Sequence, residues 1–383
     1  MVAARNAVAA AFIVNGLLFA SLVSRVPNLR DELDLSNGRL GLLLLAIAAG
    51  SLLALPSSGR LIARTSAGAV VRFGVLMSAA GLAVAAVGAT VVSSSALAAV
   101  GLFAYGIGTG VWDVAMNVEG AEVERGLGRS VMPRFHAGFS LGTIIGAGIG
   151  VAVAAADVPL LLHLGVLGVA GAVVMLRSTR AFLPAEEHPE ADTGSGTAWL
   201  EPRTLAVGLM VLCFTVAEGS ANDWLSLALI DGYDVEHWVG VAGYAVFVTA
   251  MTIGRLAGTV VLDRFGRAPT LWSTAAAAAG GIVLVVVGGH VVLVGLGILL
   301  WGLGASLGFP VGMSAAADDS ARAAARVSVV STIGYGAFLA GPPLLGALGD
   351  QVGTLDSMLA VAVLMGPAMV AVLATRHPRP EPV

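Results

Sequence analysis

Twelve apolar segments follow one another along the chain, and its arginines gather beside every second gap between them. The sequence contains no lysine, so 20 arginines carry all of the positive side-chain charge. If successive gaps are assigned alternately to the two sides of a membrane, sixteen arginines lie on the side of the N-terminus and three (Arg25, Arg30 and Arg39) lie on the opposite side. Arg255 lies within a segment. Basic residues beside membrane helices resist translocation and so stay in the cytoplasm. The pattern therefore predicts a multi-pass inner-membrane protein with both termini in the cytoplasm.

The segments have the length of membrane-spanning helices. About 20 residues are needed to cross the ~30 Å hydrocarbon core at ~1.5 Å per residue. The predicted fold is therefore an all-α integral membrane protein. We expect its spans at roughly 5–26, 37–58, 69–91, 95–117, 134–156, 159–180, 204–227, 239–262, 268–289, 291–314, 327–349 and 356–375.

Composition supports a membrane protein and argues against one that binds nucleic acid. Hydrophobic residues make up 57% of the chain and charged residues 11%, against about 25% charged residues in soluble domains. The net charge is −4, and no basic patch lies outside the helix flanks. The single cysteine, Cys213, excludes an intrachain disulfide.

A polar connection divides the twelve segments into two sets of six. Its central part, residues 184–197, is acidic and rich in Pro, Gly and Ser, as solvated linkers are. We therefore expect an N-terminal six-helix bundle over residues 1–180, a cytoplasmic linker over 181–203 and a C-terminal six-helix bundle over 204–383.

The two halves repeat each other. Residues 101–108 read Gly-Leu-Phe-Ala-Tyr-Gly-Ile-Gly, and residues 297–304 read Gly-Ile-Leu-Leu-Trp-Gly-Leu-Gly. In the first segment of each half, Asn15-Gly16 matches Glu218-Gly219. Two such bundles predict a cavity between them near mid-membrane, and alternating access by rocking of one bundle against the other.

A loop motif gives the chain a resemblance to a known family. The loop after segment eight reads Asp263-Arg264-Phe265-Gly266-Arg267, and the stretch Gly-Arg-Leu-Ala-Gly at 254–258 precedes it. This resembles the cytoplasmic gate signature, Asp-Arg-x-Gly-Arg, of the major facilitator superfamily of secondary transporters. The resemblance extends over essentially the whole chain and implies two pseudo-symmetric six-helix bundles. It also implies that the acid caps a neighbouring helix while the arginines pair on the inward face.

The resemblance assigns a set of gate residues. The matching loop of the first half has Ala63 and Ser66 in place of the acid and the glycine. We therefore expect an asymmetric gate in which Asp263 pairs with Arg255, Arg326 or Arg267. The alternative is that the loop arginines only set the topology. The candidate gate residues are Arg255, Asp263, Arg264, Arg267 and Arg64.

A narrower resemblance rests on three stretches, residues 112–119, 133–142 and 218–224. They read Trp-Asp-Val-Ala-Met-Asn-Val-Glu, Pro-Arg-Phe-His-Ala-Gly-Phe-Ser-Leu-Gly and Glu-Gly-Ser-Ala-Asn-Asp-Trp. Together they are similar to the rhizopine-transport (MosC-like) branch of the superfamily. That similarity implies uptake or exchange of small polyhydroxylated compounds such as inositol derivatives, although fold and branch do not fix a substrate.

Two acids, Glu218 and Asp113, lie well inside the predicted spans, and the other 22 of the 24 acids lie in loops or at helix ends. An ionisable group in a span costs ~2.5–3.5 kcal/mol on insertion scales, so such groups usually face a wet cavity and mark an ion or substrate path. Because burial disfavours the carboxylate, Glu218 and Asp113 are candidates for proton coupling, with His136 as a possible relay. The alternatives are acids held neutral by neighbouring helices and a histidine that is an ordinary polar flank.

Polar and aromatic residues near these acids are candidates for a substrate cavity. Asn222 follows Glu218 at i+4, on the same helical face, and Tyr105 and Asn117 share a stripe with Asp113. In related symporters of the superfamily an acid on the first helix carries the proton, and Asn15 lies nearest to that position here. The cavity candidates are Asn15, Tyr105, Asn117, Asn222, Trp224 and Tyr335.

Other positions carry an open choice between two roles. Trp224 either stacks on the substrate or anchors the helix at the membrane interface. Asp223 is turned away from Glu218 and is expected to be either an interfacial residue or an extracellular-gate residue, with Arg25 and Arg39 as its candidate partners. The Gly341-Pro342-Pro343 stretch must bend segment eleven, because proline removes a backbone donor.

The sequence thus predicts a proton-coupled secondary transporter for a small polar organic solute, polyol or sugar-like. The alternative is efflux of an amphiphilic compound by proton antiport. A membrane sensor or an intramembrane enzyme is a third class, but the sequence has no Walker loop, no metal-binding His/Glu motif and no Ser–His pair at membrane depth. We therefore expect no catalytic residues, metal or cofactor. The expected partners are a small-molecule substrate, protons and the lipid bilayer, and the protein is expected to be a monomer.

Overall fold

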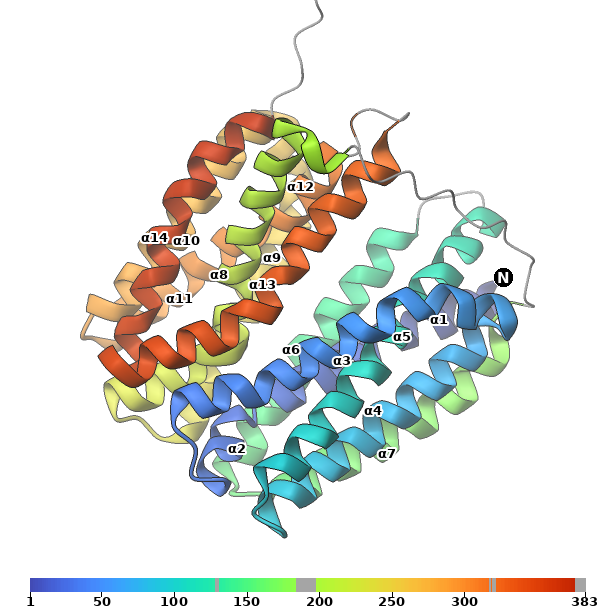
Figure 1. Ribbon diagram of the computed structural model, residues 1–383, viewed down its shortest axis with the longest axis horizontal. Coiled ribbons are helices and arrows are strands. Elements are labelled where there is room, and N and C mark those ends of the chain that lie inside the picture. The colour runs from blue at the N-terminus through green and yellow to red at the C-terminus, as the bar shows by residue number, and fades with distance from the viewer. Residues whose placement is uncertain (128–130, 184–197, 317, 319–321, 376–383) are drawn as a thin grey trace, which may run out of the picture. The chain divides into compact units, whose positions relative to one another are not determined.

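The computed structural model describes residues 1–383 except 128–130, 184–197, 317, 319–321 and 376–383. The described residues form helices and no strand (Figure 1). Twelve stretches among them are long and apolar enough to cross a membrane. This confirms the all-α membrane fold and the twelve predicted spans. The central linker residues 184–197 lie outside the described part of the chain.

The helices follow the predicted order, with long helices joined by short connections. The first half contains α1 (Val2–Val23), α2 (Val26–Glu32), α3 (Asn37–Arg64), α4 (Ala67–Thr90), α5 (Ser95–Leu127), α6 (Met132–Ala155) and α7 (Leu160–Ser178). The second half contains α8 (Pro202–Tyr233), α9 (His237–Phe265), α10 (Arg267–Val287), α11 (Val291–Ala305), α12 (Gly308–Ala316), α13 (Ala323–Val352) and α14 (Thr354–Ala371). Three short 3₁₀ turns lie after α7 (Thr179–Ala181), before α8 (Ala198–Leu200) and after α14 (Val372–Thr375).

Two helical features differ from the sequence prediction. The short helix α2 occupies the gap after the first span, with Pro27 in its first turn, where a missing N–H is tolerated. Segment ten forms one candidate span, as predicted, but its helix is divided into α11 and α12, because the chain turns at Ser306 and Leu307. Pro310 lies three residues into α12 and lacks the N–H that would continue the α-helical hydrogen bonds across this turn. By contrast α13 continues through Pro342 and Pro343 and changes direction along its length (Figure 1).

The matched glycines of the two halves make matching close contacts. A Cβ on Gly106 would lie 2.1 Å from the carbonyl oxygen of Ile47, and a Cβ on Gly302 would lie 2.6 Å from that of Phe247. Helix α5 therefore crosses α3 as α11 crosses α9, at distances that only glycine allows. The other motif glycines, Gly101 and Gly108 in α5 and Gly297 and Gly304 in α11, approach the backbones of α4 and α10 in the same way. The sequence repeat is a repeat of packing surfaces.

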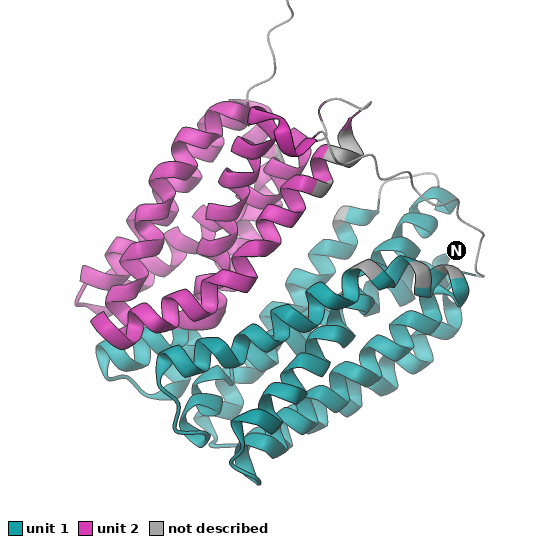
Figure 2. Ribbon diagram, viewed as in Figure 1, with its two compact units in different colours: residues 1–189, 226–245 teal, residues 190–225, 246–383 magenta. Residues whose placement is uncertain are grey.

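The chain forms two compact units (Figure 2). Unit 1 contains residues 1–189 and 226–245, and unit 2 contains residues 190–225 and 246–383. The end of α8 and the start of α9 therefore group with the first half of the chain. The remaining parts of both helices group with the second half.

Candidate functional site

Glu218 of α8 and Arg255 of α9 form an ion pair inside two candidate spans of unit 2. Nη2 of Arg255 donates to both carboxylate oxygens of Glu218 at 2.9 Å. The Glu218 side chain is 18% exposed and that of Arg255 30%, so both charges are partly shielded from solvent. The sequence favours Asp263 as a partner for Arg255, whereas the structure places the guanidinium of Arg255 on Glu218.

Close helix crossings bring the two charges together. Helix α9 crosses the break between α11 and α12, because a Cβ on Gly254 would lie 2.5 Å from Oγ of Ser306 and one on Gly258 would lie 2.4 Å from Cδ2 of Leu307. Nε1 of Trp301 donates to the carbonyl of Ala217 at 3.0 Å. This bond holds α11 beside the turn of α8 that carries Glu218. The Gly-Arg-Leu-Ala-Gly stretch is thus a helix-crossing surface that carries a charge.

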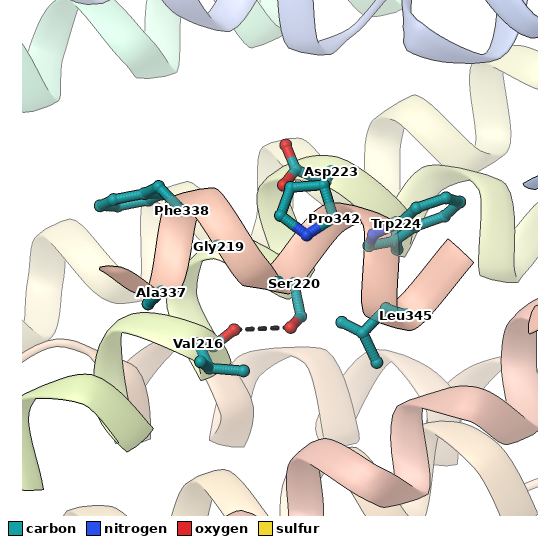
Figure 3. Close-up of a pocket in the computed structure, with 10 residues that line it drawn as sticks. Val216, Gly219, Ser220, Asp223, Trp224, Ala337, Phe338, Pro342 and Leu345 are labelled. Carbon is teal, nitrogen blue, oxygen red and sulfur yellow. Dashed lines mark hydrogen bonds between the residues drawn. The ribbon is translucent and has the colours of Figure 1, made fainter. Parts of the chain in front are cut away.

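A small pocket lies between α8 and α13, within unit 2 (Figure 3). Asp223 is half-buried at its edge, and its carboxylate has no hydrogen-bond or ion-pair partner among the described residues. Trp224 is fully buried, and its Nε1 has no partner in the described part of the chain. Ser220 Oγ donates to the carbonyl of Val216 at 2.5 Å. The lining residues are Val216, Gly219, Ser220, Asp223, Trp224, Ala337, Phe338, Gly341, Pro342 and Leu345.

Three aromatic rings continue from this pocket along α13 and α12. The ring centroids of Phe338 and Tyr335 are 6.4 Å apart, and those of Tyr335 and Phe309 are 6.3 Å apart. Each of the three side chains is half-buried. Phe338 covers Gly219, since a Cβ there would lie 3.5 Å from its ring. Tyr335, a predicted cavity residue, is therefore part of an aromatic row beside the pocket. Asn222, also predicted, is 9% exposed.

The predicted residues of the first half lie in unit 1. Asp113 is half-buried, and Nδ2 of Asn117 donates to its backbone carbonyl at 2.9 Å and approaches its carboxylate at 3.4 Å. Tyr105 is 1% exposed and Asn15 5%, so both side chains pack inside the unit. His136 is exposed and meets the ring of Phe12 edge-on, with the centroids 5.0 Å apart. The structure brings Asp113 and Asn117 together and places Tyr105 and Asn15 in the packed interior.

Two acids hold four arginines at the helix ends of unit 2 that are predicted to face the cytoplasm. Asp318 accepts from Arg267 at 2.6 Å and from Arg203 at 2.8 Å. Burial alone would raise the pKa of Asp318, but the hydrogen bonds and charges of Arg267 and Arg203 hold it below its ordinary value. In the same region Glu201 lies 2.6 Å from Nε of Arg326 and 2.5 Å from Nη1 of Arg322.

These pairs differ from the gate that the loop motif suggests. Asp318, and not Asp263, holds Arg267. Asp263 is exposed and has no ion pair within the described residues. The guanidinium of Arg264 lies over the ring of Phe265, 5.4 Å from its centroid, and Arg64 is exposed.

A second group of charges lies in unit 1, where α2 meets the end of α8 and the start of α9. Nη1 and Nη2 of Arg30 donate to the two carboxylate oxygens of Asp231 at 2.5 and 2.7 Å. Asp31 lies 3.2 Å from Nε2 of His237. Arg25, one of the two expected partners of Asp223, is instead buried and donates to the carbonyl of Val158 at 2.6 Å. The pairs of α2 were not apparent from the sequence, because their members are far apart along the chain.

Sequence comparison places the chain among known transporters. A family model described as Major Facilitator Superfamily matches residues 8–342. The uncharacterized transporter y4wD of Sinorhizobium fredii is 32% identical over 375 residues, which cover 96% of each chain. An uncharacterized MFS-type transporter of Yersinia pestis is 31% identical over 366 residues, 93% of this chain and 91% of that one. Membrane protein MosC of Rhizobium meliloti is 27% identical over 400 residues, 98% of this chain and 92% of that one.

Solved structures share the fold at low sequence identity. The nucleoside transporter NupG superposes with a TM-score of 0.77 at 14% identity, over 98% of this chain and 100% of that one. The transporter FucP in an outward conformation superposes with a TM-score of 0.66 at 17% identity, over 98% and 99% of the two chains. The family match and the solved structures confirm the predicted transporter fold. The similarity to MosC confirms the narrower resemblance.

Proposed function

Because the chain belongs to the Major Facilitator Superfamily and is a membrane transporter and not an enzyme, we propose that it carries a small polar organic solute by alternating access coupled to protons. The solute is polyol or sugar-like, and the membrane is the bacterial inner membrane. The arginine distribution along the chain supports a topology with both termini in the cytoplasm.

The ion pair of Glu218 and Arg255 is the observation that carries proton coupling. Both charges lie within candidate spans and are partly shielded from solvent, so each is stable there mainly because of the other. Protonation of Glu218 neutralises the acid and leaves Arg255 without its partner. A solute hydroxyl that accepts a hydrogen bond from Arg255 then compensates for this loss. Proton and solute therefore favour each other's binding, which is the reciprocal linkage that coupled transport requires.

The pocket on another face of α8 supports a polar ring as the solute. Asp223 offers an unpaired carboxylate to solute hydroxyls at the neighbouring pocket. Phe309, Tyr335 and Phe338 offer apolar faces against which the C–H groups of a ring can pack. The similarity to MosC favours the same class, and the nucleoside transporter among the solved neighbours shows that the fold admits other solutes.

Transport into proteoliposomes tests the proposal. A thermal-shift screen of polyols, inosamines and sugars first identifies a solute that binds. Its uptake is then measured with and without an imposed pH gradient. Glu218→Gln should abolish accumulation driven by the gradient, because the amide cannot exchange a proton, while exchange of labelled for unlabelled solute continues. Glu32→Gln, at an exposed position of α2, is the matched control and should transport normally.

The same assay separates symport from the alternative of drug-like efflux. In symport the interior of the vesicle acidifies as solute enters from an acidic exterior, and in antiport solute entry expels protons. Undiminished gradient-driven uptake in Glu218→Gln would remove Glu218 as the coupling residue.

A further inference from the structure

At the break in segment ten, Pro310 leaves one backbone carbonyl without a donor from its own helix. In an α-helix the N–H of residue i donates to the carbonyl of residue i−4, so in an unbroken segment ten the partner of residue 310 would be the carbonyl of Ser306. Proline has no N–H, and the Ser306 carbonyl accepts instead from Nε of Arg255 at 3.4 Å. We infer that Pro310 is a positioning residue, which keeps this carbonyl free so that it holds Arg255 against Glu218. The inference rests on the proposed coupling role of Glu218.

The guanidinium is held at two of its edges. Nε points to the backbone of the broken helix, and Nη2 points to both oxygens of Glu218. A planar group bonded at two edges is fixed in orientation, and an arginine side chain otherwise has large rotamer freedom. The Ser306 hydroxyl does not take the place of the carbonyl, because it donates to the carbonyl of Leu303 at 2.7 Å. The backbone carbonyl is thus the second anchor of Arg255.

The packing at the break keeps the anchor close to the arginine. Gly254 precedes Arg255 and meets Ser306 so closely that a Cβ would lie 2.5 Å from its Oγ. In the first half the position that matches Pro310 is Val114 of α5, and α5 runs unbroken from Ser95 to Leu127. Without a proline the equivalent carbonyl there remains available to its own helix. The break, the glycine and the arginine therefore form one arrangement in the second half.

Arg255 is the charged group in direct contact with Glu218. Helices α11 and α12 contain no charged residue. On the same helix as Glu218, Asp223 lines the pocket on another face. The other charged residues of α8, α9 and α13 are Arg203 and Arg326 in the ion pairs with Asp318 and Glu201, Asp231 and His237 in unit 1, Asp263 and Arg264 at the end of α9, and Asp350 near the end of α13.

A titration of the Glu218 carboxyl group tests the inference without any solute. The protonated carboxyl is followed by infrared difference spectroscopy of the purified protein, and its band is assigned by its absence in Glu218→Gln. Pro310→Ala supplies an N–H that competes with Arg255 for the Ser306 carbonyl. We expect the protonated-carboxyl band to persist to a higher pH than in the parent protein, because a less firmly held cation stabilises the carboxylate less.

Two further variants separate positioning from a general effect on the helix. Pro367→Ala changes an exposed proline inside α14 and should leave the midpoint unchanged. Arg255→Lys keeps the charge but lacks the planar fork that reaches both partners. In that background Pro310→Ala should have no further effect, since the contact that it disturbs is already gone.

An unchanged midpoint in Pro310→Ala overturns the inference, and so does an equal shift in the Arg255→Lys background. Proton-driven flux is measured separately in proteoliposomes. If the midpoint shifts as expected but the parent protein shows no proton-driven flux, the positioning role stands and the proposed coupling fails.

Discussion

The pair of Arg30 and Asp231 should hold the turn between α8 and α9 against α2. Asp231→Asn removes the negative charge and keeps the size of the side chain. A hydrogen bond to a charged group contributes about 1.5–3 kcal/mol, but the two side chains are 16% and 27% exposed, so water screens part of this. With exposed pairs at about 0–1 kcal/mol, we expect a loss of about 1 kcal/mol. That is about fivefold in a two-state equilibrium.

Spin labels measure this equilibrium directly. With one label at residue 32 in α2 and the other at residue 236 before α9, pulsed electron paramagnetic resonance gives the distribution of distances between them. Asp231→Asn should increase the population of longer distances about fivefold. Combining Arg30→Asp with Asp231→Arg should restore the original distribution, because the pair is rebuilt with its charges exchanged.

A control and a clear refutation come from the same region. Asp34 is exposed and has a positive φ of 48°, a conformation that asparagine also tolerates. Asp34→Asn therefore removes a nearby charge without strain and should leave the distances unchanged. If Asp231→Asn also leaves them unchanged, the pair is a surface contact that has no influence on the position of this turn.

Two further predictions concern stability. Asp318 has a depressed pKa in the folded protein, so its contribution is fully present above the unfolded carboxyl pKa of about 3.9 and is lost as the pH falls through the lower folded value. Asp318→Asn should therefore cost about 1 kcal/mol at neutral pH, and thermal unfolding in detergent should show this difference vanishing in acid. Gly302→Ala places a Cβ 2.6 Å from the carbonyl of Phe247 and should destabilise by about 1–3 kcal/mol. Gly295→Ala, with nothing within 4 Å, should melt like the parent; equal melting of both variants would contradict the proposed helix crossing.

Features written in local sequence patterns were predictable. Apolar length predicted the spans, and arginine placement predicted a multi-pass protein. The repeated Gly-x-x-x-aromatic-Gly-x-Gly pattern predicted the pseudo-symmetry, because close helix packing needs small residues at fixed spacing. Glu218 was identifiable as an acid that needs a partner, since a charge in the middle of an apolar span is costly.

The partners of these residues could not be predicted, because pairing depends on tertiary structure. Arg255 lies about two helical turns before a loop with a strong motif, and the motif drew the assignment toward Asp263. Its contact with Glu218 depends on how α9 crosses α8 and α11. Asp318 and Arg267 are likewise joined only by the fold. The one available signal was Pro310, since a proline within a predicted span marks a carbonyl that needs another donor.

The matched glycines of α5 and α11 separate the shape of each half from its chemistry. The first half carries an acid, Asp113, where the second carries Phe309, and the next position holds Val114 in one half and Pro310 in the other. Both differences lie beyond the last matched glycines, Gly108 and Gly304, which keep the same helix crossings in the two halves. The crossings before these positions are therefore kept, although α5 runs unbroken and segment ten breaks between α11 and α12. Differences of this kind change the chemistry of one half while the helix crossings of both halves stay the same.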